Sequence, residues 1–259
     1  MSGMTEGFEQ GEGVLHFLMP PHLSAITARL YLRSPILNGT EGRPTEIQKR
    51  LAAELGSQPL VAPMQVHGTA VVPALPIWAL PQKTRADAVF VGGDRAVWGS
   101  LRFADCTPVL IAGGFEKTWV LGVHSGFQGT VRGIVPKVLS QLGDLYRGSI
   151  VDERTHAWIG PAIGRCCYGR KKEDPSTARG LSVFPDDCRE DRGDEVFFDL
   201  HRMIAHQLKC AGVSDENIHL FPHCTSCNPE LYYSWRKGDA ADRMFLLFGK
   251  SPFLKEQWG

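Results

Sequence analysis

Apolar residues recur with the 3.6-residue period of an α-helix in three stretches of the chain. These stretches cover residues 45–56, 129–146 and 200–211. Pro44 precedes the first stretch and Gly56 closes it, as expected at the two ends of a helix. The second stretch carries the widest apolar stripe, so we expect it to pack one face against a sheet.

Short apolar runs between Gly, Pro and Asp clusters predict β-strands. The predicted strands cover residues 61–66, 71–75, 88–91, 96–101, 109–112, 119–123, 157–159, 218–221, 231–235 and 244–248. Residues 181–193 are highly charged and are expected to form a surface loop. Because the strands come in runs rather than alternating with helices, the pattern indicates an α+β fold, a layered α/β sandwich of mixed β-sheets covered by helices.

Composition bears on the class of protein and on its organisation. The 259 residues are 43% hydrophobic and 22% charged, which is ordinary for a globular chain. The polar, Gly-rich residues 1–13 are predicted to be a flexible N-terminal tail, and residues 14–259 a single catalytic domain. The start has no basic segment followed by an apolar run, and no apolar run reaches about 18–20 residues. We therefore expect a cytoplasmic protein without membrane contacts.

The charge balance favours a small-molecule ligand. The 28 basic and 28 acidic residues cancel at neutral pH, so the chain lacks the broad basic footprint of a nucleic-acid-binding protein. Seven cysteines form an odd number without a secretory context, and reduced thiols are therefore expected. The sequence leaves the oligomeric state open.

Three segments place a metal-ligand side chain beside tight-turn residues at an expected strand end. They contain His67, Cys106 and His124. Two imidazoles and a thiolate suit zinc, and three protein ligands leave one position for a water whose pKa zinc lowers toward about 7. The spacing is not diagnostic, so two alternatives stay open. One is a pair of hydrogen-bonded core histidines with a buried cysteine, and the other is a hydrolase with Cys106 as nucleophile and His124 as base.

Four other cysteines and a Gly-containing loop give weaker signals. Cys224 and Cys227 form a lone CxxC, compatible with half a zinc site or a redox pair. The adjacent Cys166 and Cys167 lack the spacing of a second such pair, so structural thiols are favoured over a second metal. The segment 159–168 has neither a Walker nor a GxGxxG pattern, and we interpret it as a tight turn that is able to offer backbone N–H groups to an anion.

Several segments keep a common order along the chain and together carry a family resemblance. The matching pieces are QVHG at 65–68, RADAVF at 85–90, ADCTPVLIA at 104–112, VHSGFQGTVRGIV at 123–135, IGPAIGRCCY at 159–168, FDL at 198–200, CT at 224–225 and YSWRKGDAADRM at 233–244. Each piece alone is weak, but jointly they are specific. The chain resembles the zinc-dependent purine nucleoside phosphorylase family, historically called the laccase-domain or polyphenol oxidase family.

This resemblance implies a layered α/β fold and a Zn²⁺ ion held by His67, Cys106 and His124. It also implies phosphorolysis of adenosine, inosine, guanosine and methylthioadenosine, with adenosine deamination at the same site. Purine nucleosides and phosphate are then the expected partners. Cys106 and Asp105 are the expected catalytic residues. Cys106 supplies the thiolate, and Asp105 is expected to orient the site or to relay a proton. The alternative is that Asp105 is a turn aspartate that caps local backbone.

The expected substrate contacts are Phe127, Gln128, Arg236 and Arg243. The family segment after the second histidine usually reads His-Ala-Gly-Trp-Arg-Gly, whereas this chain has HSGFQG at 124–129. Phe127 keeps an aromatic wall there, but Gln128 loses a cation. Arg236 and Arg243 are expected to contact ribose or phosphate, because a planar guanidinium suits both. The family's Arg-Gly-Gly segment before the first helix is not recognisable, so the departures bear on phosphate binding rather than on the metal.

The laccase label predicts copper, and the histidine content argues against it. A multicopper oxidase needs about ten imidazoles, largely in His-x-His pairs. This chain has nine histidines and no such pair. Two other functions stay as alternatives: a peptidoglycan-editing amidohydrolase that removes serine from a UDP-muramoyl precursor, and a non-catalytic zinc-binding protein.

Overall fold

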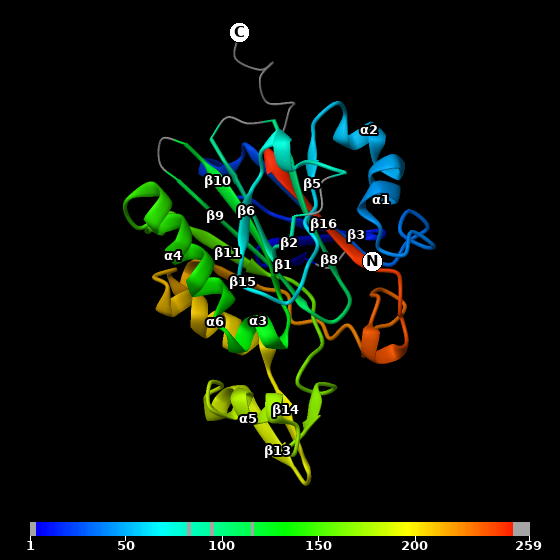
Figure 1. Ribbon diagram of the computed structural model, residues 1–259, viewed down its shortest axis with the longest axis vertical. Coiled ribbons are helices and arrows are strands. Elements are labelled where there is room, and N and C mark those ends of the chain that lie inside the picture. The colour runs from blue at the N-terminus through cyan, green and yellow to red at the C-terminus, as the bar shows by residue number, and fades with distance from the viewer. Residues whose placement is uncertain (1–3, 82–83, 94–95, 115–116, 251–259) are drawn as a thin grey trace.

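The computed structural model describes residues 4–81, 84–93, 96–114 and 117–250. In this part of the chain two large β-sheets share one core, and helices cover the outer face of the second sheet (Figure 1). A third, small sheet lies beyond one end of these layers, at the bottom of the view in Figure 1. The arrangement confirms the predicted α+β class with mixed sheets.

The first sheet has seven strands in the order β1-β2-β3-β4-β16-β8-β5. All neighbours are antiparallel except β5 and β8. The strands are β1 (Met4–Thr5), β2 (Phe8–Gly11), β3 (Val14–Phe17), β4 (Ile26–Tyr31), β16 (Met244–Lys250), β8 (Trp98–Phe103) and β5 (Leu60–Val61).

The second sheet has six strands in the order β15-β11-β9-β10-β7-β6. The pairs between β11, β9, β10 and β7 are antiparallel, and the two edge pairs are parallel. The strands are β15 (Ile218–Leu220), β11 (His156–Ile159), β9 (Thr107–Gly113), β10 (Trp119–Ser125), β7 (Ala88–Gly92) and β6 (Val71–Pro73).

Strand β9 shows why the layers stack in this order. Its side chains alternate between the two faces of the sheet. Leu110 and Ala112 point into the core shared with the first sheet, whereas Val109 and Ile111 point into the core under the helices. Because both faces are buried, the strand reads as a continuous apolar run rather than as an alternating one.

Each predicted helical stretch contains a helix, but two of the stretches are broken and α5 was not predicted. The helices are α1 (Pro44–Arg50), α2 (Ala52–Leu55), α3 (Phe127–Val131), α4 (Ile134–Tyr146), α5 (Pro175–Leu181) and α6 (Leu200–Cys210). The stretch 45–56 breaks at Leu51, and the stretch 129–146 breaks at Gly133, whose φ of 69° lies in the left-handed region. Helices α4 and α6 lie together over the second sheet (Figure 1). Among the described residues, every helix is too short or too polar to cross a bilayer.

The predicted surface loop at 181–193 is partly wrong. Its end forms β13 (Arg189–Arg192), which pairs with β14 (Glu195–Phe198) in the third sheet, next to β12 (Gly169–Lys171). The strand is missed because its own side chains are charged and at least partly exposed. Its neighbour β14 supplies the apolar face of this unit, with Val196 and Phe198 fully buried.

Two further predictions of local structure need correction. Residues 4–11 of the predicted tail form β1 and β2, because Phe8 is fully buried in the main core although its neighbours are polar. Residues 231–235 are a turn rather than a strand, since the N–H groups of Leu231 and Tyr232 donate to the carbonyl of Asn228. Residues 1–3 of the predicted tail lie outside the described residues.

Candidate metal centre and cavity

Three segments far apart in the sequence meet at one end of the second sheet. Strands β9 and β10 are antiparallel, so the start of β9 lies beside the end of β10, with His124 opposite Pro108. Cys106 precedes β9 directly, and His67 comes from the turn before β6. The candidate ligand atoms of His67, Cys106 and His124 all lie within 4.8 Å of one another, which confirms that the three side chains converge.

The spacing of the three side chains fits a single ion. The Nε2 atom of His67 lies 3.8 Å from Sγ of Cys106, and the imidazole rings of His67 and His124 have centroids 5.0 Å apart. Around a tetrahedral zinc ion, a nitrogen and a sulfur ligand are about 3.6 Å apart. Three side chains of these types at this spacing are therefore able to hold a small divalent ion with one position open.

A buried aspartate that the sequence analysis gave no role, Asp87, organises the metal ligands. Its carboxylate accepts hydrogen bonds from the backbone N–H groups of Val66, His67 and Gly68 at 3.2, 2.9 and 2.7 Å. It also lies 2.9 Å from Nδ1 of His124. An ionised carboxylate only accepts, so Nδ1 of His124 carries the proton and Nε2 is left for a metal.

The pKa values around the centre follow from burial and from this hydrogen-bonded network. Burial alone would raise the pKa of Asp87, but hydrogen bonds from His124 and from backbone amides outweigh it and lower that pKa. Burial lowers the pKa of His124, which keeps its imidazole neutral, as a metal ligand must be. Burial and the charges of Asp105 and Asp87 raise the pKa of the Cys106 thiol to about 12. Without a cation beside it, Cys106 is therefore a poor nucleophile.

Unusual backbone conformations hold the turns of the centre. His67 has a φ of 55° and Asp105 a φ of 81°, both in the left-handed region that non-glycine residues rarely adopt. Gly126 leaves the space that the ligands need, because a Cβ at this position would lie 2.5 Å from Sγ of Cys106. The three hydrogen bonds from backbone N–H groups to the Asp87 carboxylate hold the turn at His67 in this conformation.

Asp105 connects the centre to two other segments. One carboxylate oxygen accepts from the hydroxyl of Thr225 at 2.6 Å, and the other accepts from the backbone N–H of Arg236 at 2.8 Å. Its backbone carbonyl accepts from Ile163 N–H at 2.9 Å. Asp105 therefore joins segments of the cavity wall, and its predicted roles in orienting the site or relaying a proton stay predictions.

The three candidate ligands lie in the wall of a cavity of about 640 Å³. The other residues that line it are Glu41, Gly42, Met64, Gln65, Arg102, Ala104, Asp105, Ile163, Tyr168, Trp235, Arg236, Ala240, Ala241 and Arg243. This volume lies within the range of about 300–1,000 Å³ that is common for small-molecule sites.

Three arginines contribute to the cavity wall, and two of them were expected there. Arg236 donates to the carbonyl of Cys167 at 2.8 Å, and Arg243 donates to backbone carbonyls of residues 239, 240 and 242. Arg102 on β8 was missed. Burial lowers its pKa to about 10, and its Nη1 is buried without a hydrogen-bond partner among the described residues.

Phe127 and Gln128 do not belong to the cavity wall in the described part of the chain. Phe127 packs behind Tyr168, which does line the cavity, and its ring contacts those of Phe184 and Phe198. Gln128 lies partly buried in α3. The substrate contacts predicted for these two residues stay predictions.

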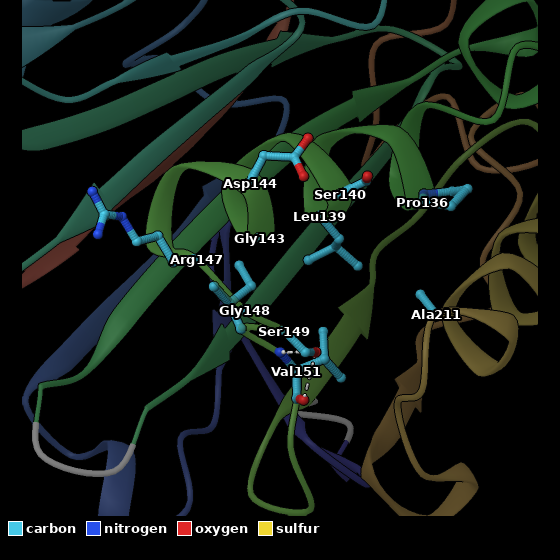
Figure 2. Close-up of a pocket in the computed structure, with 11 residues that line it drawn as sticks. Pro136, Leu139, Ser140, Gly143, Asp144, Arg147, Gly148, Ser149, Val151 and Ala211 are labelled. Carbon is cyan, nitrogen blue, oxygen red and sulfur yellow. Dashed lines mark hydrogen bonds between the residues drawn. The ribbon is translucent and has the colours of Figure 1, made fainter.

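A second cavity of about 530 Å³ lies at the far end of α4 (Figure 2). Figure 2 shows Leu139, Arg147 and Val151 around it, with Ser149 hydrogen-bonded to Val151. The described residues that line it include neither a histidine nor a cysteine. This second cavity therefore does not offer a metal the imidazole and thiolate ligands that the first cavity offers.

The arrangement of histidines agrees with the argument against a multicopper centre. Three groups of described residues bring together metal-ligand atoms, and no group contains more than two histidines. The type-2/type-3 cluster of a multicopper oxidase takes many more imidazoles at close range.

Comparison with known proteins gives relatives along most of the chain. A purine nucleoside phosphorylase of Aquifex aeolicus is 30% identical over 189 residues, which cover 73% of this chain and 82% of that protein. A purine nucleoside phosphorylase of Synechocystis sp. is 28% identical over 201 residues, covering 67% of this chain and 73% of that protein.

The fold also has a solved counterpart. The crystal structure of YlmD from Geobacillus stearothermophilus superposes with a TM-score of 0.79 at 23% identity, covering 94% of this chain and 98% of that one. The family model described as multi-copper polyphenol oxidoreductase laccase matches residues 42–249. The chain therefore belongs to this laccase-like family.

Proposed function

We propose that this protein is a zinc-dependent purine nucleoside phosphorylase. The observation that carries the proposal is the convergence of His67, Cys106 and His124 in the wall of a cavity that also contains three arginines. The names of the relatives at about 28–30% identity support the same reaction class.

The donor set fits zinc better than magnesium or calcium. Two imidazoles and one thiolate suit zinc, whereas magnesium and calcium take oxygen ligands. Asp87 supplies the carboxylate that orients His124, as is usual behind a metal-bound histidine. When bound, zinc would supply Lewis acidity and activate water near neutral pH.

Phosphate would bind to the arginines of the cavity. In phosphorolysis a phosphate oxygen bonds to C1′ of the ribose while the bond from C1′ to the purine breaks, which gives ribose 1-phosphate and free base. The unpartnered Nη1 of Arg102 is the donor most in need of an anion, because a buried cationic N–H group without a partner is costly. Arg102 thus offers a cationic donor to an anion inside the cavity.

The purine and ribose would lie against the outer part of the cavity. Trp235 and Met64 line it with 63% and 46% of their surface exposed, which is unusual for such large apolar side chains. The indole face of Trp235 suits stacking against a purine. Adenosine, inosine, guanosine and methylthioadenosine are the proposed substrates, and adenosine is also proposed to be deaminated.

Product analysis of the zinc-loaded protein tests this proposal. Inosine should give hypoxanthine and ribose 1-phosphate only when inorganic phosphate is present, and adenosine should also give inosine and ammonia. Absence of phosphate-dependent base release would overturn the phosphorylase proposal. Serine released from a UDP-muramoyl precursor would instead indicate the editing amidohydrolase, and zinc binding without any turnover would indicate a binding protein.

Replacing Arg102 tests the phosphate site separately. Arg102→Met should raise the KM for phosphate by about 10- to 100-fold, since a hydrogen bond to a charged group contributes roughly 1.5–3 kcal/mol. Deamination of adenosine should change much less, because that reaction uses no phosphate. Arg179→Met is the matched control, since Arg179 is exposed on α5 and does not line the cavity. Equal phosphate KM values in the two variants would remove Arg102 from the site.

A further inference from the structure

A second group of sulfur atoms lies apart from the candidate metal centre. The Sγ atoms of Cys166, Cys167, Cys224 and Cys227 all lie within 4.8 Å of one another. Cys227 is 3.6 Å from Cys166 and 3.4 Å from Cys167, measured between Sγ atoms. Four sulfurs at tetrahedral positions about 2.3 Å from a zinc ion are about 3.8 Å from each other. The four side chains therefore already have the spacing of a one-ion cage.

We propose that Cys166, Cys167, Cys224 and Cys227 bind a second zinc ion in an all-sulfur site. The four cysteines are free in the structure, and their sulfurs are well beyond the roughly 2.05 Å of a disulfide bond. A tetrahedral set of four thiolates selects zinc or iron–sulfur chemistry. An iron–sulfur cluster places several atoms between its ligands and needs a wider cage, so a single zinc ion fits best.

The fold builds this cage from two neighbouring strands. Strands β11 and β15 are parallel, so the segments that follow them leave the sheet at the same edge. A backbone bridge between Ala162 and Cys224 continues the pairing of these segments. The N–H groups of Cys167 and Tyr168 donate to the carbonyl of Gly164, which forms the turn that presents Cys166 and Cys167.

Gly164 also lies against the sulfurs. Its N–H donates to Sγ of Cys224 at 3.2 Å, the kind of amide–sulfur bond that stabilises a metal-bound thiolate. A Cβ at this position would lie 3.2 Å from Sγ of Cys166 and 3.1 Å from Cβ of Cys224, closer than ordinary packing allows. A residue with a side chain would therefore push two of the ligands.

The proposed zinc would fix two segments that support the cavity. Thr225, next to Cys224, donates to Asp105, and the carbonyl of Cys167 accepts from Arg236. The all-sulfur site thus stabilises the wall of the cavity without contacting a substrate. Its ligands are distinct from those of the first centre, so this proposal does not rest on the proposed function.

The arrangement of these cysteines differs from two paired CxxC motifs. The CxxC of Cys224 and Cys227 meets the adjacent pair Cys166–Cys167, and the turn at Gly164 points both adjacent side chains toward the same space. Structural thiols were favoured from the sequence because a second metal site was expected to need a second cysteine pair at normal spacing. Proximity across the β11–β15 edge supplies the missing two ligands instead.

Zinc counting in variants tests the proposal. Full-length Cys106→Ala protein, which lacks a ligand of the first centre, should keep about one zinc ion per chain after removal of free metal. Adding Cys227→Ser should remove that ion, because it removes one of the four ligands. Since Cys227 is exposed, the change should disturb the rest of the fold little. Adding Cys210→Ser is the matched control, since Cys210 is an exposed cysteine outside the group, and it should keep the ion. Equal zinc content with Cys227→Ser and Cys210→Ser would overturn the site.

Two further measurements keep all four cysteines, so they do not depend on the folding of a variant that lacks one of them. In the wild-type protein, zinc should slow alkylation of the four cysteines, mapped by mass spectrometry, while alkylation of Cys210 stays unchanged. X-ray absorption of zinc-loaded Cys106→Ala protein should show four sulfur ligands at about 2.3 Å. Equal alkylation with and without zinc, a disulfide within the group, or a nitrogen-containing shell would each contradict the proposal.

A glycine substitution tests the geometry of the cage more finely. Gly164→Ala should weaken zinc binding at the four cysteines by about 10-fold or more, as is typical when the groups supporting metal ligands are disturbed. Gly148→Ala is the control, because no atom lies within 4 Å of a Cβ built there. Unchanged zinc affinity in Gly164→Ala would contradict the close contact between this glycine and the bound thiolates.

Discussion

At the scale of single residues, one buried carboxylate organises the candidate metal centre. Asp87 is fully enclosed and joins the turn of His67 to the side chain of His124. It therefore fixes both the position of one ligand and the tautomer of another. The metal affinity of the centre should depend on this residue although it does not contact the ion.

Replacing this carboxylate should weaken zinc binding at the centre. Asp87→Asn should lower zinc affinity at the centre by about 10- to 100-fold, because an amide supports the three backbone N–H groups and His124 less well than a charged carboxylate does. Competition with a zinc-binding dye in the Cys227→Ser background measures this site alone. Asp144→Asn, at an exposed position on α4, is the control. Wild-type affinity in Asp87→Asn would show that the network does not orient the ligands.

The family resemblance implied the three ligands but not the groups around them. The residue types of His67, Cys106 and His124 suit zinc, but their spacing alone left other interpretations open. Asp87 was available in the sequence as a lone acidic residue before an apolar strand, a signal for a buried hydrogen-bond acceptor. Arg102 gave no signal, because an arginine in a strand is normally on a solvent-facing side.

At the scale of elements, the small sheet is held by an aromatic core. Phe198 on β14 is fully buried, and its ring centroid lies 5.0 Å from that of Phe127 and 4.9 Å from that of Phe184. Phe127 in turn packs against Tyr168 of the cavity wall. This unit therefore supports one side of the cavity through edge-to-face contacts between aromatic rings.

Truncating the central ring should be costly. Phe198→Ala should lower the free energy of unfolding by about 3–5 kcal/mol, the usual cost of removing a buried phenylalanine. Phe197→Ala is the matched control on the opposite face of β14, where the ring is only partly buried beside Arg192. Urea denaturation followed by fluorescence measures both variants. Equal losses would contradict the assignment of the core to the Phe198 face.

A helix or strand was predicted correctly where its own residues carry a regular apolar pattern. It was missed where contacts with other elements stabilise it. The helix at 200–211 was found because its apolar face is regular, and Asp199 caps its start by accepting from Arg202 N–H. The strand β13 was missed because its stability comes from the apolar residues of β14. Strand β2 was missed because Phe8 is its one buried residue, whereas β3 and β4 were missed although Leu15 and Leu30 are fully buried.

At the scale of the whole molecule, several histidines are held neutral by the fold. Burial is the largest cause that lowers the pKa of His156, His201, His219 and His223, and that of His156 falls to about 4. His156 stacks on His219, with 3.2 Å between Nδ1 and Nε2, so a charge on either ring disfavours a charge on the other. Acidification should therefore lower the stability of the fold through histidines that are not ligands of the candidate metal centre.

The sign of this effect follows from proton linkage. The unfolded chain binds protons at histidines below a pH of about 6.5, whereas the folded chain resists them until lower pH. Stability is therefore fully present above about pH 6.5 and declines as the pH falls toward 4. Urea midpoints of chelator-treated protein should be lower at about pH 5 than at about pH 7.5. His156→Phe should reduce that difference, and a midpoint that rises on acidification would contradict the prediction.

The whole-molecule arrangement joins the two proposed metal sites through one wall. The three-ligand centre lies at the start of β9 and the end of β10, and the four cysteines follow the strands β11 and β15 of the same sheet. Asp105 links them by accepting from Thr225. The sequence predicted the layered class, because apolar runs define buried strands, but strand order and this link depend on contacts that no local pattern records.

An anomalous-scattering map collected at the zinc absorption edge, from crystals of the zinc-loaded protein, tests directly whether the three side chains share one ion. We expect a peak about 2.0–2.1 Å from a ring nitrogen of both His67 and His124 and about 2.3 Å from Sγ of Cys106. Crystals that contain zinc but show no peak between these three side chains would contradict this expectation.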